Sequence, residues 1–153
     1  MKDEARVLGE IRVALAGDGA RDKSLERVAG ILRAAGGYRW VGIYDVVGDE
    51  IAVAAWSGPG EPAHPRFPVS QGLCGDAVRR GRTVVVGDVT RDPRYLTTFG
   101  STRSEIVVPI LAPGGGFVVG TVDAESEKTD AFDEEDRRFL ESCAAEIGRT
   151  GGP

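Results

Sequence analysis

Residues 40–56 read WVGIYDVVGDEIAVAAW. Valine, isoleucine and aromatic side chains fill both ends of this segment, and such residues favour β-strands. Between the two ends, Gly48-Asp49 has the composition of a tight turn. The segment therefore predicts a β-hairpin with strands over residues 40–47 and 51–56.

Helical and strand patterns on both sides of this hairpin predict the remaining elements. Ser24 is the expected N-cap of the second helix, and Gly36 is the expected left-handed residue that ends it. Helices are expected over residues 3–16, 24–35, 72–81 and 133–148, and further strands over residues 84–86, 106–112 and 117–123. This order predicts an α+β fold, in which an antiparallel sheet carries the terminal helices (about 3–35 and 133–148) on one face. The chain, residues 1–153, is expected to form one domain.

Composition argues against several classes of protein. The chain has 153 residues and a formal net charge of -5, whereas nonspecific nucleic-acid binding requires clustered Lys and Arg. No apolar run approaches the roughly 18 residues of a membrane span, and the N-terminus is amphipathic rather than a signal peptide. The cysteines Cys74 and Cys143 and the single histidine, His64, match no metal-ligand spacing. We therefore expect a cytoplasmic protein without cofactor or metal, whose partners are small molecules or proteins rather than nucleic acid or membrane.

A glutamate begins the apolar run in Arg103-Ser104-Glu105-Ile106-Val107-Val108-Pro109. This pattern puts the Glu105 carboxylate at the start of a buried strand, where an unpaired charge costs folding free energy. Directly before it, residues 88–103 form a connection of 16 residues without apolar periodicity. Compact domains seldom keep such a long connection unless it has a function. The sequence therefore predicts a ligand site near Glu105, with residues 88–103 as a mobile lid.

The segment from Trp40 to Asp136 resembles a GAF domain, and within that superfamily it is most similar to the free methionine-(R)-sulfoxide reductases. The resemblance is carried by Trp40-Val41-Gly42-Ile43-Tyr44, Gly72-Leu73-Cys74-Gly75, Ser104-Glu105-Ile106-Val107 and the alternating acids Asp123 and Glu125. It implies that Trp40 and Tyr44 form aromatic walls around a ligand. It also implies that the three acids bind the ligand's amino group, with Glu125 one methylene longer than the family's usual aspartate.

The same resemblance implies that two redox cysteines are missing. Thr98, seven residues before Glu105, stands where the family has its catalytic cysteine, and His64 stands where it has another. Sulfoxide reduction requires a thiolate that attacks sulfur, which a threonine hydroxyl cannot replace. Cys74 is then the remaining candidate for thiol chemistry.

Two functional classes follow. The first is a small-molecule-binding GAF domain that acts as a sensor or regulatory module without thiol catalysis, as a homodimer through its terminal helices. Its ligand would be an amino acid or a derivative, bound by Trp40, Tyr44, Cys74, Thr98, Glu105, Asp123 and Glu125. The second class is a methionine-(R)-sulfoxide reductase of altered cysteine usage, with Cys74 as its catalytic residue. We favour the first class, and therefore expect a binding protein rather than an enzyme.

Other ligands and purely structural roles remain alternatives. A cyclic nucleotide would need a phosphate cradle, for which Arg91, Arg94 and Arg103 are weak candidates, and the cysteine-histidine pair usual for bilin attachment is absent around the long loop. The aromatic pair could be core packing, and the three acids could cap loops or pair with Arg94 and Arg103. Cys74 could be a small buried filler, and Cys143 is expected in the core.

Overall fold

The computed structural model describes residues 2–150; Met1 and residues 151–153, which the single-domain prediction includes, lie outside the described residues. The helices are α1 (Glu4–Ala16), α2 (Arg21–Gly36), α3 (Gly72–Arg80) and α4 (Glu134–Thr150), with a short 3-10 helix η1 (Val89–Arg91). The strands are β1 (Trp40–Val47), β2 (Glu50–Ser57), β3 (Arg66–Pro68), β4 (Val84–Val86), β5 (Ser104–Leu111) and β6 (Val118–Ser126).

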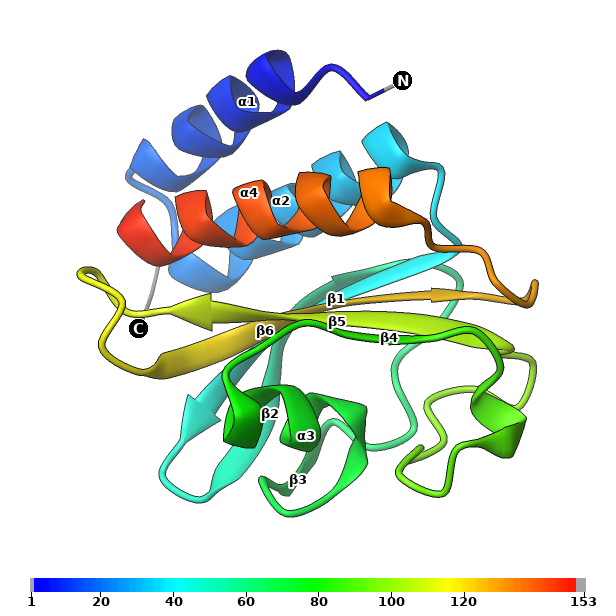
Figure 1. Cartoon of the computed structure of the whole chain (residues 1–153). Helices are drawn as coiled ribbons and strands as arrows, with labels where there is room; N and C mark the ends of the chain where they lie inside the picture. Colours follow the sequence, from blue (N-terminus) through cyan, green and yellow to red (C-terminus); the bar gives the residue numbers. More distant parts are fainter. Residues whose placement is uncertain (1, 151–153) are drawn as a thin grey trace.

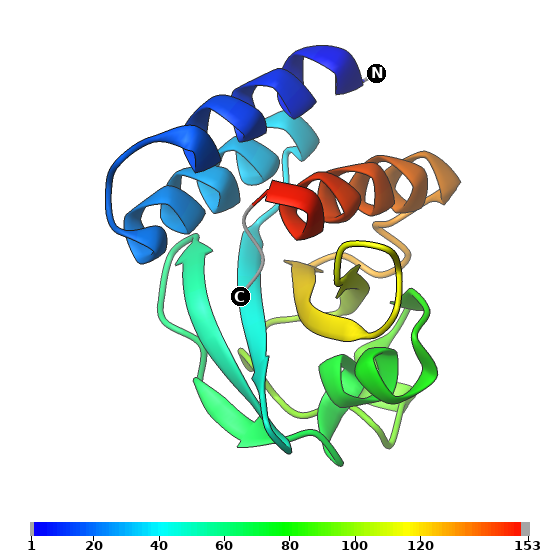
Figure 2. The ribbon, with the colours of Figure 1, turned by 90° about the vertical axis from the view of Figure 1, so that its left-hand side faces the viewer.

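The six strands form one antiparallel sheet in the order β3-β2-β1-β6-β5-β4. Helices α1, α2 and α4 lie on one face of this sheet, and α3 lies on the other together with the segments around it (Figure 1). The view turned by 90° shows the same two layers on either side of the sheet (Figure 2). The expected α+β fold, with the terminal helices on one face, is confirmed.

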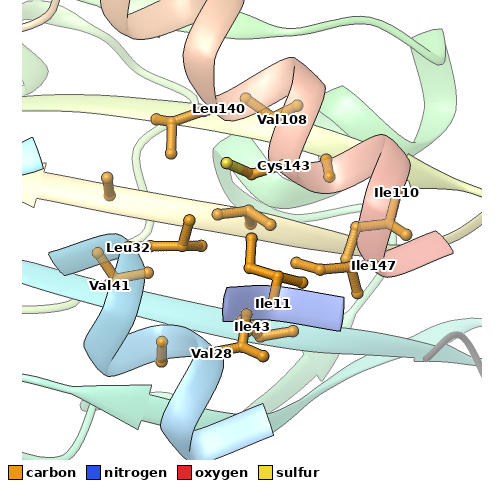
Figure 3. Close-up of a cluster of buried hydrophobic side chains, with 14 of the residues drawn as sticks. Ile11, Val28, Leu32, Val41, Ile43, Val108, Ile110, Leu140, Cys143 and Ile147 are labelled. Atoms are coloured by element: carbon orange, nitrogen blue, oxygen red, sulfur yellow. The ribbon is translucent and has the colours of Figure 1, made fainter. Parts of the chain in front are cut away.

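The main hydrophobic core lies between the sheet and the three helices (Figure 3). It is built from Ile11, Val28, Leu32, Val41, Ile43, Val108, Ile110, Leu140, Cys143 and Ile147, among others. Val41 and Ile43 alternate with Trp40 and Tyr44 along β1, so the aromatic pair faces the opposite side of the sheet. A second, smaller cluster on that side contains the aromatic pair and residues of α3. Cys143 is buried in the main core, as predicted.

The prediction for α2 is wrong at both ends. The helix begins at Arg21 and has no side-chain cap, and Ser24 is a buried residue inside it. At the other end Gly37, not Gly36, is left-handed, with φ +67°, and its N–H bonds to the carbonyl of Arg33. Gly36 is the last residue of the helix, and the Tyr38 ring packs against it so closely that a Cβ there would lie 2.1 Å from ring atoms.

The predicted strands near the acids are too short. β5 begins at Ser104 and β6 ends at Ser126, so Glu105 and Glu125 belong to the ladder, each one residue inside the end of its strand. The proline-rich segment after β2 contains only the short β3, which lies at the sheet edge, where proline is tolerated.

Asp133 precedes α4 and exchanges reciprocal hydrogen bonds of 2.9 Å with Asp136. No helix in residues 2–150 is long and apolar enough to span a membrane.

Candidate ligand-binding site

Three carboxylates converge on the face of the sheet opposite α1, α2 and α4. Glu105 of β5 and Glu125 of β6 are direct cross-strand partners, and Asp123 pairs with Val107 on one side and Gly42 on the other. Strand alternation therefore points all three side chains the same way. Each residue is at most 3% exposed, and one oxygen from each carboxylate lies within 4.8 Å of the others. We refer to Glu105, Asp123 and Glu125 as the acidic triad.

Few polar groups accompany the acidic triad. The Thr102 hydroxyl donates to Oε1 of Glu125 at 2.7 Å, and the Cys74 thiol lies 3.9 Å from Oδ2 of Asp123, at the limit of a sulfur hydrogen bond. The remaining oxygens of these two acids, Oδ1 of Asp123 and Oε2 of Glu125, are buried without a hydrogen-bond partner. A buried, unpartnered acceptor costs free energy, so the site has two strong acceptors that a cation could satisfy.

The structural alternative for these acids, pairing with nearby arginines, is wrong. Arg94 forms ion pairs with Asp76 and Asp92 instead. Arg103 donates to the backbone carbonyls of Gly100 and Thr102. Among the described residues, no Lys, Arg or His forms an ion pair with any member of the triad.

Burial dominates the electrostatics of the triad. It raises the pKa of Asp123 to about 6, although the contact with the Cys74 thiol opposes the shift. Burial, together with the charge of Asp123, also raises the pKa values of Glu105 and Glu125 well above 4.5. Burial therefore favours protonated forms within the triad, because three adjacent carboxylates cannot all be charged in a buried position.

Aromatic rings form one wall of the site. The Trp40 and Tyr44 ring centroids lie 6.5 Å apart, and Phe99 packs edge-on against Trp40 at 5.4 Å. Gly42 lies between the two rings on β1, and a Cβ there would be 2.3 Å from the Trp40 ring and 3.0 Å from Tyr44. The indole N–H of Trp40 donates to the carbonyl of Gly60 at 3.0 Å, which fixes the ring.

Helix α3 brings Cys74 to the triad. Cys74 lies in the first turn, as predicted, and accepts a hydrogen bond from the Thr121 hydroxyl at 3.6 Å. Burial and the charge of Asp123 raise the pKa of the thiol well above 9.0. Cys74 in this environment is a neutral thiol, which is a poor nucleophile.

The predicted site residues come together around two small cavities. Tyr44, Cys74, Thr98, Glu105 and Asp123 line one cavity of about 20 Å³, which His64 also lines. Trp40 and Glu125 line a second cavity of about 10 Å³ with Phe99 and Thr102. A cavity of this size holds about one water molecule. An organic ligand therefore requires part of the wall to move.

Residues 96–99 of the long loop form part of the walls of these two cavities. Leu96, Thr97 and Thr98 line the larger cavity, and the carbonyl of Thr98 accepts from the backbone N–H of Ala63 at 3.2 Å. The loop covers the site in this conformation, as the lid hypothesis requires, and its mobility stays a prediction.

Sequence reasoning missed several residues that contact the site, among them Thr121, Thr102 and Phe99. Thr121 continues the alternation that leads to Asp123 and Glu125, so the strand period of two could have revealed it. Thr102 and Phe99 lie in the irregular loop, where no period indicates which side chains point inward.

Chemically, the acidic triad can bind a cation, either a protonated amine or a metal ion.

The GAF domain family model matches residues 20–150. The chain belongs to the GAF domain family. This GAF domain is 31% identical over 135 residues to GAF domain-containing protein A of Dictyostelium discoideum, covering 88% of this chain and 83% of that protein. It is 31% identical over 112 residues to the free methionine-R-sulfoxide reductase of Saccharomyces cerevisiae, covering 72% of this chain and 62% of the yeast protein, less than two thirds of its length.

A solved structure supports the same relationship for this GAF domain. The free methionine-R-sulfoxide reductase of Neisseria meningitidis, solved in complex with its substrate, is 36% identical and superposes with a TM-score of 0.84. The match covers 96% of this chain and 87% of that one. This GAF domain is therefore closely similar to free methionine-R-sulfoxide reductases.

Proposed function

We propose that this GAF domain binds a free amino acid, or a close derivative, through the ligand's cationic amino group. The observation that carries the proposal is the acidic triad, whose Asp123 Oδ1 and Glu125 Oε2 are buried without a hydrogen-bond partner. An ammonium group has three N–H donors and one positive charge. It can donate to both free oxygens and to Glu105, and it compensates the charge that burial otherwise disfavours.

The aromatic wall supports the same class of ligand. Trp40 and Tyr44 lie beside the triad, and a cation close to such rings gains about 0.5 to 2 kcal/mol. The similar proteins then suggest which amino acid to test first. Because the Neisseria meningitidis protein is a free methionine-R-sulfoxide reductase, free methionine sulfoxide is our first candidate.

Binding without thiol catalysis is the finer part of this proposal. Cys74 is buried with a raised pKa, and the family's catalytic cysteine is implied at the position of Thr98. A sensor or regulatory module would then read out the occupied site through the lid or through another protein.

Reduction by Cys74 is the second candidate, favoured by its place in the wall of the cavity that Glu105 and Asp123 also line and by the similarity to reductases. The Cys74 thiolate would attack the sulfoxide sulfur and take up its oxygen as a sulfenic acid, releasing methionine after proton transfer. Two equivalents of an external thiol would then return the cysteine to its thiol, giving a disulfide and water.

A thermal-shift screen of free amino acids, methionine sulfoxides and cyclic nucleotides tests the binding proposal. A ligand at about 100 times its dissociation constant stabilises the folded state by about 2.7 kcal/mol. We expect stabilisation by free amino acids of the methionine sulfoxide type. Stabilisation by cyclic nucleotides alone would contradict the proposed ligand class.

A further inference from the structure

An ion-pair cluster around one buried aspartate lies beside the site, on the same helix as Cys74. Its centre is Asp76, whose side chain is 5% exposed. Three guanidinium groups contact this carboxylate: Arg79 at 3.5 Å, Arg80 at 3.1 Å and Arg94 at 2.8 Å. Arg79 and Arg80 belong to α3 itself, whereas Arg94 belongs to the loop that covers the site.

Arg94 is held in the orientation that this contact needs. Its Nε and Nη2 donate to the Asp92 carboxylate at 3.0 and 2.6 Å, and its backbone N–H donates to Oδ1 of Asp92 at 2.9 Å. Nη1 is then directed to Oδ2 of Asp76. Charge-assisted hydrogen bonds of this length are among the stronger ones in proteins, and here the acceptor is almost fully buried.

The loop leads directly from Arg94 into the site. Leu96 packs against Gly72 at the start of α3, where a Cβ would lie 3.2 Å from the Leu96 Cβ. The Tyr95 hydroxyl accepts from the backbone N–H of Thr98 at 3.2 Å. The Tyr95–Thr98 hydrogen bond thus stabilises residues 94–98, and Arg94 and Leu96 contact α3. A substitution at Arg94 is therefore expected to alter the position of the cavity wall.

We propose that Asp76 and Arg94 are positioning residues, whose ion pair holds residues 94–99 closed over the acidic triad and sets how fast a ligand enters and leaves. This rests on the proposed function only in that the covered site binds a ligand. Opening requires the Asp76–Arg94 contact to break, while Asp76 keeps Arg79 and Arg80 as partners. Asp76 is therefore not left as an isolated buried charge when the loop opens.

Hydrogen exchange of the ligand-free protein tests this ion pair directly. Arg94→Met removes the partner on the loop, and Arg80→Met is the matched control, because it removes a partner of the same carboxylate within α3. We expect amide exchange in residues 95–99 to accelerate roughly threefold to tenfold in Arg94→Met, and to stay within about twofold of wild type in Arg80→Met. Unchanged exchange in Arg94→Met, or equal acceleration in both variants, would overturn the proposal.

A double-mutant cycle separates this role from general destabilisation. Asp76→Asn should accelerate the same amides, and the double variant with Arg94→Met should show less than the sum of the two single effects, because both changes remove the Asp76–Arg94 contact. Additive effects would contradict the proposal. If Asp76→Asn fails to fold, Arg94→Lys, which keeps the charge but loses the planar fork, should give an intermediate rate.

Stopped-flow kinetics with free methionine-(R)-sulfoxide measures the rates at which this probe enters and leaves the site. A change in the overall stability of the fold alone would not alter these rates. Both the association and the dissociation rate constants should rise in Arg94→Met, with a smaller change in their ratio, and unchanged constants would count against the ion pair. If no variant binds this probe, the proposed ligand is wrong, while the exchange experiment still decides whether the ion pair holds the loop closed.

Discussion

Glu105 and Glu125 are direct cross-strand partners in the β5–β6 ladder, and both side chains are buried. Like charges at such a position destabilise a sheet, and burial adds the cost of desolvation. Burial raises the pKa values of all three acids, which favours protonated forms and so reduces the repulsion between the pair. The triad is thus expected to lower the stability of the fold while providing a site that can bind a cation.

Replacing one of these acids by its amide should stabilise the ligand-free protein. A carboxyl group whose pKa is raised on folding contributes stability that is complete below its unfolded pKa of about 4 and is lost as pH rises through its folded pKa. Glu105→Gln stays neutral, so at about pH 8 it should be more stable than wild type by at least about 1 kcal/mol, with little difference at about pH 4.

Thermal unfolding of both proteins across this pH range measures that difference. Glu50→Gln is the control, since the side chain of Glu50 is 43% exposed beside Arg66 and should show no such gain. A Glu105→Gln protein that is less stable than wild type at about pH 8 would mean that Glu105 is stabilised as an anion.

Ligand binding should strengthen as pH rises. A cationic amine competes with the protons of the triad, so affinity should increase from about pH 5 towards about pH 8, and each binding event should release protons. Calorimetry in buffers of different ionisation enthalpy reports this release. Affinity independent of pH over that range would indicate that the triad is already charged in the empty site.

Gly42 should be essential to the aromatic wall. In Gly42→Ala the added methyl group meets the rings of Trp40 and Tyr44, and overpacking of this kind costs about 1 to 3 kcal/mol. Both stability and affinity should fall. Gly9→Ala is a suitable control, because Gly9 lies in α1 with no atom within 4 Å of the added Cβ, and alanine there should be neutral or stabilising by up to about 1 kcal/mol.

Turnover separates the binding protein from the reductase. The wild-type protein should not reduce free methionine-(R)-sulfoxide above the rate without enzyme, with thioredoxin or dithiothreitol as reductant. Thr98→Cys should gain activity, because Thr98 and Cys74 line the same cavity and the new thiol could attack while Cys74 resolves the sulfenic acid. Robust wild-type turnover that disappears in Cys74→Ser would establish the reductase instead.

The parts of the fold that local patterns encode could be predicted from the sequence. The hairpin from Trp40, the α3 helix with Cys74 in its first turn, and the order of helices and strands all follow from apolar periodicity and glycine positions. The start of α2 could not, because Ser24 is a good N-cap by composition, while packing buries it inside the helix.

Only part of the candidate site could be predicted from the sequence. Strand alternation indicates which acids share a face, but contacts between distant segments depend on tertiary structure. Asp123 and Glu125 share a strand face by alternation, so their convergence was predictable. Their partners across the chain were not: the register that opposes Glu105 to Glu125, and the contact of Arg94 with Asp76, depend on tertiary structure that no local spacing specifies.

Binding of an amino group by the acidic triad is tested most directly by calorimetric titration with a matched pair of ligands. Free methionine-(R)-sulfoxide carries the cationic amine, and its N-acetyl derivative has the same side chain without that charge. We predict that only the free amino acid binds the wild-type protein, and that Glu105→Gln weakens its binding by about 1.5 to 3 kcal/mol, the range of a charge-assisted hydrogen bond. Equal binding of both ligands, or unchanged affinity in Glu105→Gln, would contradict the proposed role of the triad.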